Sequence, residues 1–308
     1  MKYGLLACAV TLAAAMLFGC AGGGVAPSTA PLRGFAQHDQ RTSAVRGALL
    51  YVSEMSGNDV AVYSYPDLQP QGKLTGLKRP EGLCVDKRSG SIWVVLGAFA
   101  HKIVEFAHGG TAPIRTLRSK SLSYAQSCAV DPVNGDISVV NNITGDDPGN
   151  VVVFQNGRGH GTVEVAPKMF YYGFVSYDDR GNAYLDGLGN GFILAKSRGG
   201  GAFHAVAVHG VKTRYAGGIE WTRSSLAVEN PKHGIIYRLS RGTVTGTTTL
   251  QGTCEVEQFV IDGDRIVAPN DCGSNGGGSV GVYAYPAGGA PIAQLTGLRY
   301  PFAAAISR

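Results

Sequence analysis

The sequence predicts an all-β fold, a six-bladed β-propeller over residues 48–308, and three observations lead to this prediction. First, short runs rich in β-branched and aromatic residues alternate with turns that contain Gly, Asn and Asp, without convincing long amphipathic helices. Second, similar segments recur at a period of about 44 residues, within the range of four-stranded blades. Third, each end of the repeat array has a strand that lacks its neighbour. We therefore expect the N- and C-terminal strands to pair and close the ring.

The two ends of the array are the most similar parts of the sequence. Four segments carry this similarity: VYSYP at 62–66, LTGLKRP at 74–80, VYAYP at 282–286 and LTGLRYP at 295–301. Tyr63 and Tyr283 are 220 residues apart, which is five steps of about 44 residues. Matching ends favour a closed ring, because an open solenoid usually has atypical polar repeats at its ends.

A second repeated element lies between these ends. It is a β-rich run that ends in a polar residue and a turn, and it begins near residues 82, 127, 174, 218, 258 and 303. Each of the first five runs is followed by a second short strand. The sixth run has no follower, and ALLYVSE at 48–54 supplies the missing strand. Closure of this kind removes the exposed strand edges that would invite aggregation. A β-sandwich with accidental similarity is the alternative.

The cleanest copy of this element, PEGLCVD at 80–86, carries a resemblance to known proteins. It has the pattern P-x-G-φ-x-V-D, where φ is an apolar residue, followed by a Gly-containing turn and the apolar strand SIWVV. This pattern resembles the NHL-type six-bladed propellers and the related regucalcin/gluconolactonase and strictosidine-synthase-like folds. The resemblance covers residues 48–308 and implies the fold. Binding proteins and enzymes share it, so it does not imply a function.

The N-terminus is typical of a bacterial lipoprotein signal peptide, which we place at residues 1–19. Lys2 provides a positive charge, an apolar stretch covers residues 5–18, and LFGC at 17–20 resembles the lipobox. We expect Cys20 to be lipidated and to hold the exported protein in the bacterial cell envelope, at the outer membrane or the periplasmic face, through acyl chains. An ordinary secretory signal with an incidental Cys20 is the alternative.

Residues 20–47 are predicted to form a flexible tether, because they are rich in Gly, Ala, Pro, Ser and Thr and lack hydrophobic periodicity. The whole chain has 27 basic and 22 acidic residues, hence a net charge of +5. Much of this excess lies in the signal peptide and the tether, so the predicted propeller is nearly neutral and has no basic run. Nucleic acid is therefore not an expected partner.

Four cysteines remain within the predicted propeller, in a compartment that permits disulfides. Cys254 precedes the first strand of its repeat and Cys272 follows the second strand, so both lie in loops at the same face and we expect them to pair. Cys84 and Cys128 lie in the innermost strands of consecutive blades, where they either pair or remain buried thiols. The sequence has no C-x-x-C motif or Cys/His cluster, so metal binding by these cysteines is not expected.

Polar residues occur at the predicted strand ends that surround one mouth of the central channel. Loops that enter the innermost strands and loops that leave the second strands meet at this mouth. The candidate ligand-binding or metal-binding residues are Glu81, Gln126, Asn141, Asp186, Glu229, Glu257, Asn270 and Asp271. Their oxygen atoms suit Ca²⁺ or another divalent cation, which is therefore a candidate cofactor. Alternatively, such side chains bind the backbone of nearby turns.

The resemblance to the regucalcin/gluconolactonase family implies a chemistry for this mouth. That family holds a divalent metal with a Glu, two Asn and an Asp, and hydrolyses lactones. Glu81 occupies a place similar to that of the family's Glu, and Asn141 and Asn270 match its amides by position. The family's local motifs around these ligands are absent here, and its Asp has no assigned counterpart, so the catalytic residues stay unknown.

The sequence leaves two functions open. The first is a binding or scaffold module that contacts a protein, peptide or glycan with one face of the propeller. Tyrosines near the strand-entry loops would either supply contact surface or pack between blades: Tyr124, Tyr171, Tyr172, Tyr215 and Tyr300. The second function is a metal-dependent hydrolase or lyase, lactonase-like, at the channel mouth. A tightly held divalent ion at Glu81 would favour this second function.

Overall fold

The computed structural model describes residues 47–142, 148–273 and 277–308. The predicted signal peptide, the lipidation site at Cys20 and the tether up to residue 46 lie outside the described residues. Among the residues that are described, no helix is long and apolar enough to cross a membrane.

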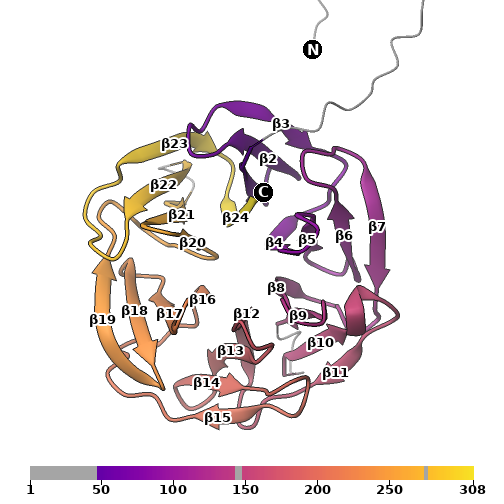
Figure 1. Cartoon of the computed structure of the whole chain (residues 1–308), viewed down its shortest axis with the longest axis vertical. Coiled ribbons are helices and arrows are strands. Elements are labelled where there is room, and N and C mark those ends of the chain that lie inside the picture. The colour runs from indigo at the N-terminus through magenta and orange to yellow at the C-terminus, as the bar shows by residue number, and fades with distance from the viewer. Residues whose placement is uncertain (1–46, 143–147, 274–276) are drawn as a thin grey trace, which may run out of the picture. The chain divides into compact units, whose positions relative to one another are not determined.

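The described residues form six four-stranded antiparallel sheets, arranged as blades around a central axis (Figure 1). We number the blades along the chain and give their strands from the axis outward. Blade 1 contains β24 (Pro301–Ser307), β1 (Leu49–Glu54), β2 (Asp59–Ser64) and β3 (Pro70–Leu74). Blade 2 contains β4 (Pro80–Val85), β5 (Ile92–Leu96), β6 (Lys102–Phe106) and β7 (Pro113–Arg118). Blade 3 contains β8 (Ala125–Val130), β9 (Ile137–Asn141), β10 (Asn150–Phe154) and β11 (Thr162–Glu164), with the short 3₁₀ helix η1 (Gln155–Gly157) after β10.

The remaining blades have the same order of strands. Blade 4 contains β12 (Tyr171–Tyr177), β13 (Ala183–Leu188), β14 (Phe192–Lys196) and β15 (His204–Val206). Blade 5 contains β16 (Ile219–Thr222), β17 (Ser225–Asn230), β18 (Ile235–Ser240) and β19 (Thr243–Thr249). Blade 6 contains β20 (Val260–Asp262), β21 (Arg265–Asp271), β22 (Gly278–Ala284) and β23 (Ala293–Leu298).

Blade 1 is built from both ends of the propeller sequence. β24 pairs antiparallel with β1, from Leu49 opposite Ser307 to Glu54 opposite Pro301. The prediction of an all-β six-bladed propeller closed by its terminal strands is therefore confirmed. Ser307 also ties blade 1 to blade 2, because its hydroxyl donates a hydrogen bond to the carbonyl of Gly90.

The outermost strand of a blade is more exposed than the strands nearer the axis. The second strands β1 and β5 are buried at every position, because both faces of each strand pack against neighbouring blades. The rim strands β3 and β7 are exposed at every position but one. This explains why the sequence of β5, IWVVL, is continuously apolar and does not alternate as a half-exposed strand would.

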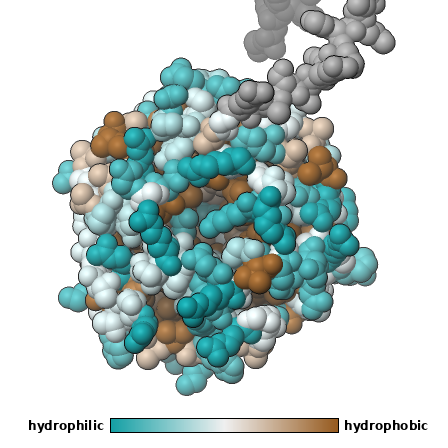
Figure 2. Space-filling view, viewed as in Figure 1, coloured by the Kyte–Doolittle hydropathy of each residue, from teal (hydrophilic) through white to brown (hydrophobic). Residues whose placement is uncertain are grey.

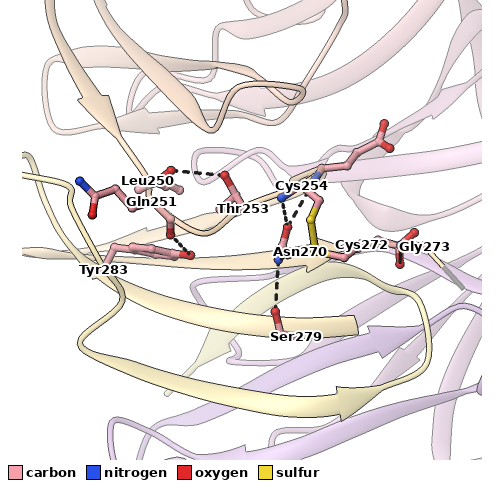
Figure 3. Close-up of a disulfide and its surroundings, with 11 residues drawn as sticks. Leu250, Gln251, Thr253, Cys254, Asn270, Cys272, Gly273, Ser279 and Tyr283 are labelled. Carbon is pink, nitrogen blue, oxygen red and sulfur yellow. Dashed lines mark hydrogen bonds between the residues drawn. A yellow bond between two sulfur atoms is a disulfide. The ribbon is translucent and has the colours of Figure 1, made fainter. Parts of the chain in front are cut away.

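Both cysteine pairs form disulfides. Cys84 in β4 and Cys128 in β8 join the inner strands of blades 2 and 3, with their Cα atoms 5.6 Å apart. Cys254 and Cys272 join the segment before β20 to the end of β21, with their Cα atoms 5.1 Å apart (Figure 3). The predicted Cys254–Cys272 bridge is confirmed. Of the two alternatives for Cys84 and Cys128, the structure shows the bridge.

Candidate functional site

The six inner strands surround the axis of the ring (Figure 1), and residues of these strands line a hollow there, the central channel. These strands run in the same direction through the channel, as the parallel bridge between Gln258 and Ala303 of consecutive blades illustrates. We call the opening at the N-terminal ends of the inner strands the entry mouth, and the opening at their C-terminal ends the exit mouth. The residues predicted from the sequence lie at the entry mouth.

Four predicted carboxyl groups at the entry mouth have raised pKa values. Burial is the main cause, and it raises the pKa of Glu81 to about 7 and the pKa values of Asp186 and Glu257 to about 8. Burial also raises the pKa of Glu229 well above its ordinary value, and charge repulsion from Glu257 and Asp186 adds to this rise. Near neutral pH much of this group is therefore protonated, which reduces the negative charge available to hold a cation.

Two predicted amide ligands hold the backbone where it approaches an inner strand. The Oδ1 of Asn141 accepts the N–H of Tyr124 at 2.6 Å, just before β8. The Oδ1 of Asn270 accepts the N–H of Cys254 at 2.7 Å, beside the Cys254–Cys272 disulfide (Figure 3). These contacts correspond to the turn-binding alternative given above.

Asp186 and Glu229 lie at matching positions in the second strands of blades 4 and 5. Asp186 is fully buried, and its two oxygens accept the N–H groups of Phe174 at 2.6 Å and of Gly217 at 3.0 Å. Gly217 precedes β16, so this carboxyl group joins blade 4 to blade 5. Glu229 is equally buried, but neither of its carboxyl oxygens has a hydrogen-bond partner in the described structure.

The predicted residues at strand entry are also engaged by other side chains. The Oε1 of Glu81 accepts a hydrogen bond from the Nε of Arg79 at 2.7 Å. The Oε1 of Gln126 accepts one from the Nδ2 of Asn142 at 2.6 Å. Asp271 accepts the N–H of a residue two positions further along its own loop. Within the described ranges, no three His, Cys, Asp or Glu side chains form a group that could hold a metal ion.

The tyrosines named from the sequence divide between packing and exposure. Tyr172 is buried, and its hydroxyl accepts the N–H of Ala166 at 2.8 Å, as the packing alternative predicts. Tyr215 and Tyr300 are 46 % and 36 % exposed, so their rings are available for contact. Tyr124 and Tyr171 are half-buried.

A cavity at the exit mouth is a feature that the sequence analysis missed. It has a volume of about 310 Å³ and is lined by consecutive residues of all six inner strands, such as Leu83 to Val85 of β4 and Ala304 to Ile306 of β24. We call it the channel cavity. The lining begins after Glu81 and Gln126 in sequence, so the cavity occupies the part of the channel that is away from the entry mouth. On the face shown in Figure 2, hydrophilic residues predominate and hydrophobic residues lie deeper between them near the centre.

Gln258 lines the channel cavity and bridges two blades across part of the channel. From blade 6 its side chain reaches the backbone of blade 2, where its Oε1 accepts the Leu83 N–H at 3.2 Å and its Nε2 donates to the Leu83 carbonyl at 2.6 Å. The backbone of Gln258 is bonded to Phe302 and Ala304 of blade 1, each at 3.0 Å. Because blade 1 lies between blades 6 and 2, the side chain crosses one side of the channel.

The wall of the channel cavity combines apolar, aromatic and charged groups. Trp221 is among the lining residues, and Lys87 and Arg308 lie exposed at the rim. Arg308 forms an ion pair with Asp262 at 2.6 Å. Burial raises the pKa of Glu220 to about 8, so near neutral pH this carboxyl group is largely protonated and able to donate a hydrogen bond to a ligand.

Comparison with known proteins identifies a shared fold but no family. No known protein-family profile matches the sequence, and no curated protein gives a significant sequence match. A chain from the crystal structure of a nidogen/laminin complex is similar in structure, with a TM-score of 0.68 and 14% identity, over 85% of this chain and 99% of that chain. A protein of unknown function from Bacteroides caccae has a TM-score of 0.63 and 10% identity, over 85% of this chain and 99% of that chain. At these identities the likeness concerns the fold alone.

Proposed function

We propose that this protein is a non-catalytic binding module whose ligand occupies the channel cavity at the exit mouth. The observation that carries the proposal is the cavity itself, which all six inner strands line and the Gln258–Leu83 hydrogen bonds limit on one side. Ligand sites in proteins are concave and mostly preformed, with a few polar groups in an apolar wall. A volume of about 310 Å³ is at the small end of such sites, so we infer that it takes a terminal or projecting group of a larger partner.

The partner in this proposal is a protein, peptide or glycan of the bacterial cell envelope. The lipobox-like LFGC at 17–20 and the predicted tether support this setting, because a lipidated Cys20 would hold the propeller near the membrane. A chain of similar fold belongs to a nidogen/laminin complex, which supports a role in binding a partner.

The hydrolase alternative has less support at the entry mouth. The amide oxygens of Asn141 and Asn270 are engaged by backbone N–H groups, and the Oε1 of Glu81 is engaged by Arg79. A divalent ion would have to replace these contacts with its own, and it would compete with protons for the buried carboxyl groups.

A cavity-filling substitution tests the proposed binding site. Ala129 lines the channel cavity and is half-buried, so Ala129→Phe places a ring inside it. We expect the wild-type protein to bind a component of a cell-envelope glycan and peptide array, and Ala129→Phe to weaken this binding about tenfold or more. Val130→Trp, at the next position of the same wall, provides a second variant in case the first does not fold.

The control adds the same ring elsewhere. Ala202 is exposed in the loop before β15, so Ala202→Phe should bind as the wild type does. Thermal denaturation of each variant would establish that it is folded. Equal binding by the cavity and control variants, or the lack of any wild-type ligand in the array, would contradict the proposal.

A further inference from the structure

A groove runs between blades 4 and 5 and opens on the same face as the exit mouth. Its volume is about 1050 Å³, and successive strands line it from the axis to the rim. Trp221 of β16 lies nearest the axis, Tyr184 of β13 and Lys196 of β14 follow, and Val206 of β15 lies at the rim. We call it the interblade groove. Trp221 also lines the channel cavity, so the groove and the cavity share a wall.

The interblade groove concentrates positive charge. Its cationic lining residues are Arg180, Lys196, Arg198, Arg223 and Arg241. Only two carboxylates accompany them, Asp178 and Asp179, which gives the lining a net charge of +3. The propeller as a whole, residues 49–308, carries a net charge of only +2 by its Lys, Arg, Asp and Glu content. The groove therefore accounts for the entire positive excess of the propeller.

Most of these cations have no counter-ion in the described part of the chain. Lys196 is paired with Asp178 at 3.7 Å, whereas the four arginines are exposed and form no ion pair among the described residues. They lie in four separate turns, which come close to one another only because blade 4 packs against blade 5. Guanidinium groups bind carboxylates and sulfates through two parallel hydrogen bonds, so this arrangement suits an anionic ligand.

An aromatic stack lies among the arginines. The rings of Tyr184 and Trp221 are 5.5 Å apart with an interplanar angle of 13°. The Nζ of Lys196 lies 4.6 Å from the centre of the Tyr184 ring and donates to its hydroxyl at 2.7 Å. The indole N–H of Trp221 donates to Asp179 at 3.4 Å. The stack fixes the orientation of a partly exposed, flat apolar surface in the groove wall.

We propose that the interblade groove binds an acidic polysaccharide, a polymer whose sugar units carry carboxylate or sulfate groups. A sugar ring has an apolar C–H face that packs on an aromatic ring, here Trp221, and the anionic groups at its edge accept hydrogen bonds from the surrounding arginines. An acidic peptide carries its charges on flexible side chains and has no regular flat apolar face. For this reason the stack favours a glycan over a peptide.

This inference goes beyond the proposed function, because most of the groove lies outside the channel cavity. Binding in the groove can therefore be tested in a variant whose channel cavity is filled. The test measures binding by titration calorimetry to polygalacturonate, a carboxylated glycan, and to heparin, a sulfated glycan. Neutral dextran and poly-L-glutamate serve as reference polymers. Binding to either acidic glycan supports the inference, and the one that binds more tightly identifies the anionic group.

The decisive variant removes three groove arginines together, Arg198→Gln, Arg223→Gln and Arg241→Gln. We expect it to weaken binding of the acidic glycan about tenfold or more. The matched control removes the same charge from exposed arginines outside the groove: Arg118→Gln, Arg158→Gln and Arg214→Gln. The control should change the affinity by less than about threefold, because exposed charges further away than about 10 Å are screened by salt.

A second variant tests the aromatic surface. Trp221→Leu should weaken binding of the glycan and leave any weak binding of poly-L-glutamate unchanged. Equal losses in the two triple variants, unchanged glycan affinity in Trp221→Leu, or binding of poly-L-glutamate as tight as that of the glycans would each overturn the inference. Ala129→Phe should retain glycan binding in the groove, so a failure of the cavity proposal is distinguishable from a failure of this one.

Discussion

At the scale of single residues, the environment of a carboxyl group at the entry mouth determines what the group does. Asp186 and Glu229 are equally buried and lie at matching positions, but only Asp186 binds the backbone of its neighbours. The side chain of Glu229 is one methylene longer, which displaces its oxygens relative to those of an aspartate at the same place. An unpaired buried carboxylate is costly, and burial accordingly raises the pKa of Glu229 well above its ordinary value.

Glu81 gives the stability of the protein a dependence on pH. Burial raises its pKa from 4.5 to about 7, so the folded protein binds this proton more tightly than the unfolded chain does. The resulting stabilisation is complete below about pH 4.5 and is lost as the pH rises through about 7. We expect the free energy of unfolding of the wild type to fall over this range. In Glu81→Gln the fall should be smaller by on the order of 3 kcal/mol.

Urea denaturation at several pH values from about 4.5 to 8 would measure this difference. Asp67 is an exposed carboxylate in the turn after β2, so Asp67→Asn should follow the wild-type curve and serves as the control. If Glu81→Gln and the wild type lose stability in parallel, the folded protein does not bind the proton of Glu81 more tightly than the unfolded chain does.

At the scale of strands and loops, the sequence repeat predicted where the strands of each blade lie along the chain, but not which groups their side chains contact. The entry-mouth residues were found because polar residues recur where strands end. The contact of Asn141 with the Tyr124 N–H depends on the path of a loop, which the sequence does not specify. The lining of the channel cavity was missed because residues such as Leu83 and Ala304 are apolar and are expected in any core.

The interblade groove was missed for a different reason. Its cations are far apart in the sequence and lie in separate turns, from Arg180 to Arg241. Each is an ordinary exposed residue of its own turn, and the net charge of the propeller is small. Only the packing of blade 4 against blade 5 brings the turns together. An unequal distribution of arginines among the blades, with several in blades 4 and 5, is the one signal that the sequence offered.

The two disulfides should stabilise the protein to different degrees. The cysteines of the Cys84–Cys128 pair are 44 residues apart and those of the Cys254–Cys272 pair are 18 apart. A longer closed loop restricts the unfolded chain more strongly. Replacing both members of the first pair with Ser should therefore lower the free energy of unfolding by about 4 kcal/mol, and replacing the second pair by about 3 kcal/mol.

Guanidinium denaturation of the two double variants, with and without a reducing agent, would test this order. Reduction should destabilise each double variant by the contribution of the bridge that it retains. A larger loss from the Cys254–Cys272 pair would mean that local strain or residual structure in the unfolded chain outweighs loop length.

At the scale of the whole molecule, the ring depends on the pairing of β1 with β24. These strands lie side by side, with Leu49 opposite Ser307, so a short linker could join residue 308 to residue 48 as a hairpin. A circular permutant with new ends at Gly252, which is exposed between β19 and β20, would retain every blade. We expect it to fold with a Tm within about 4 °C of the wild-type value.

Deletion of residues 301–308 provides the contrast. It removes β24, the inner strand of blade 1, and exposes the edge of β1, so we expect loss of cooperative unfolding and aggregation. Scanning calorimetry and light scattering would compare the two proteins. A permutant as unstable as the deletion would show that continuity of the chain through blades 5 and 6 matters more than closure of the ring.

The hydrogen bonds between Gln258 and Leu83 narrow one side of the channel between the channel cavity and the entry mouth. We therefore expect a group bound in the channel cavity to enter and leave through the exit mouth. A polymer bound along the interblade groove would partly cover the exit mouth, and it would then slow both the entry of that group and its departure. A polymer that binds after the inner group would slow its departure, and a polymer that binds first would slow its entry, so the order of binding would matter.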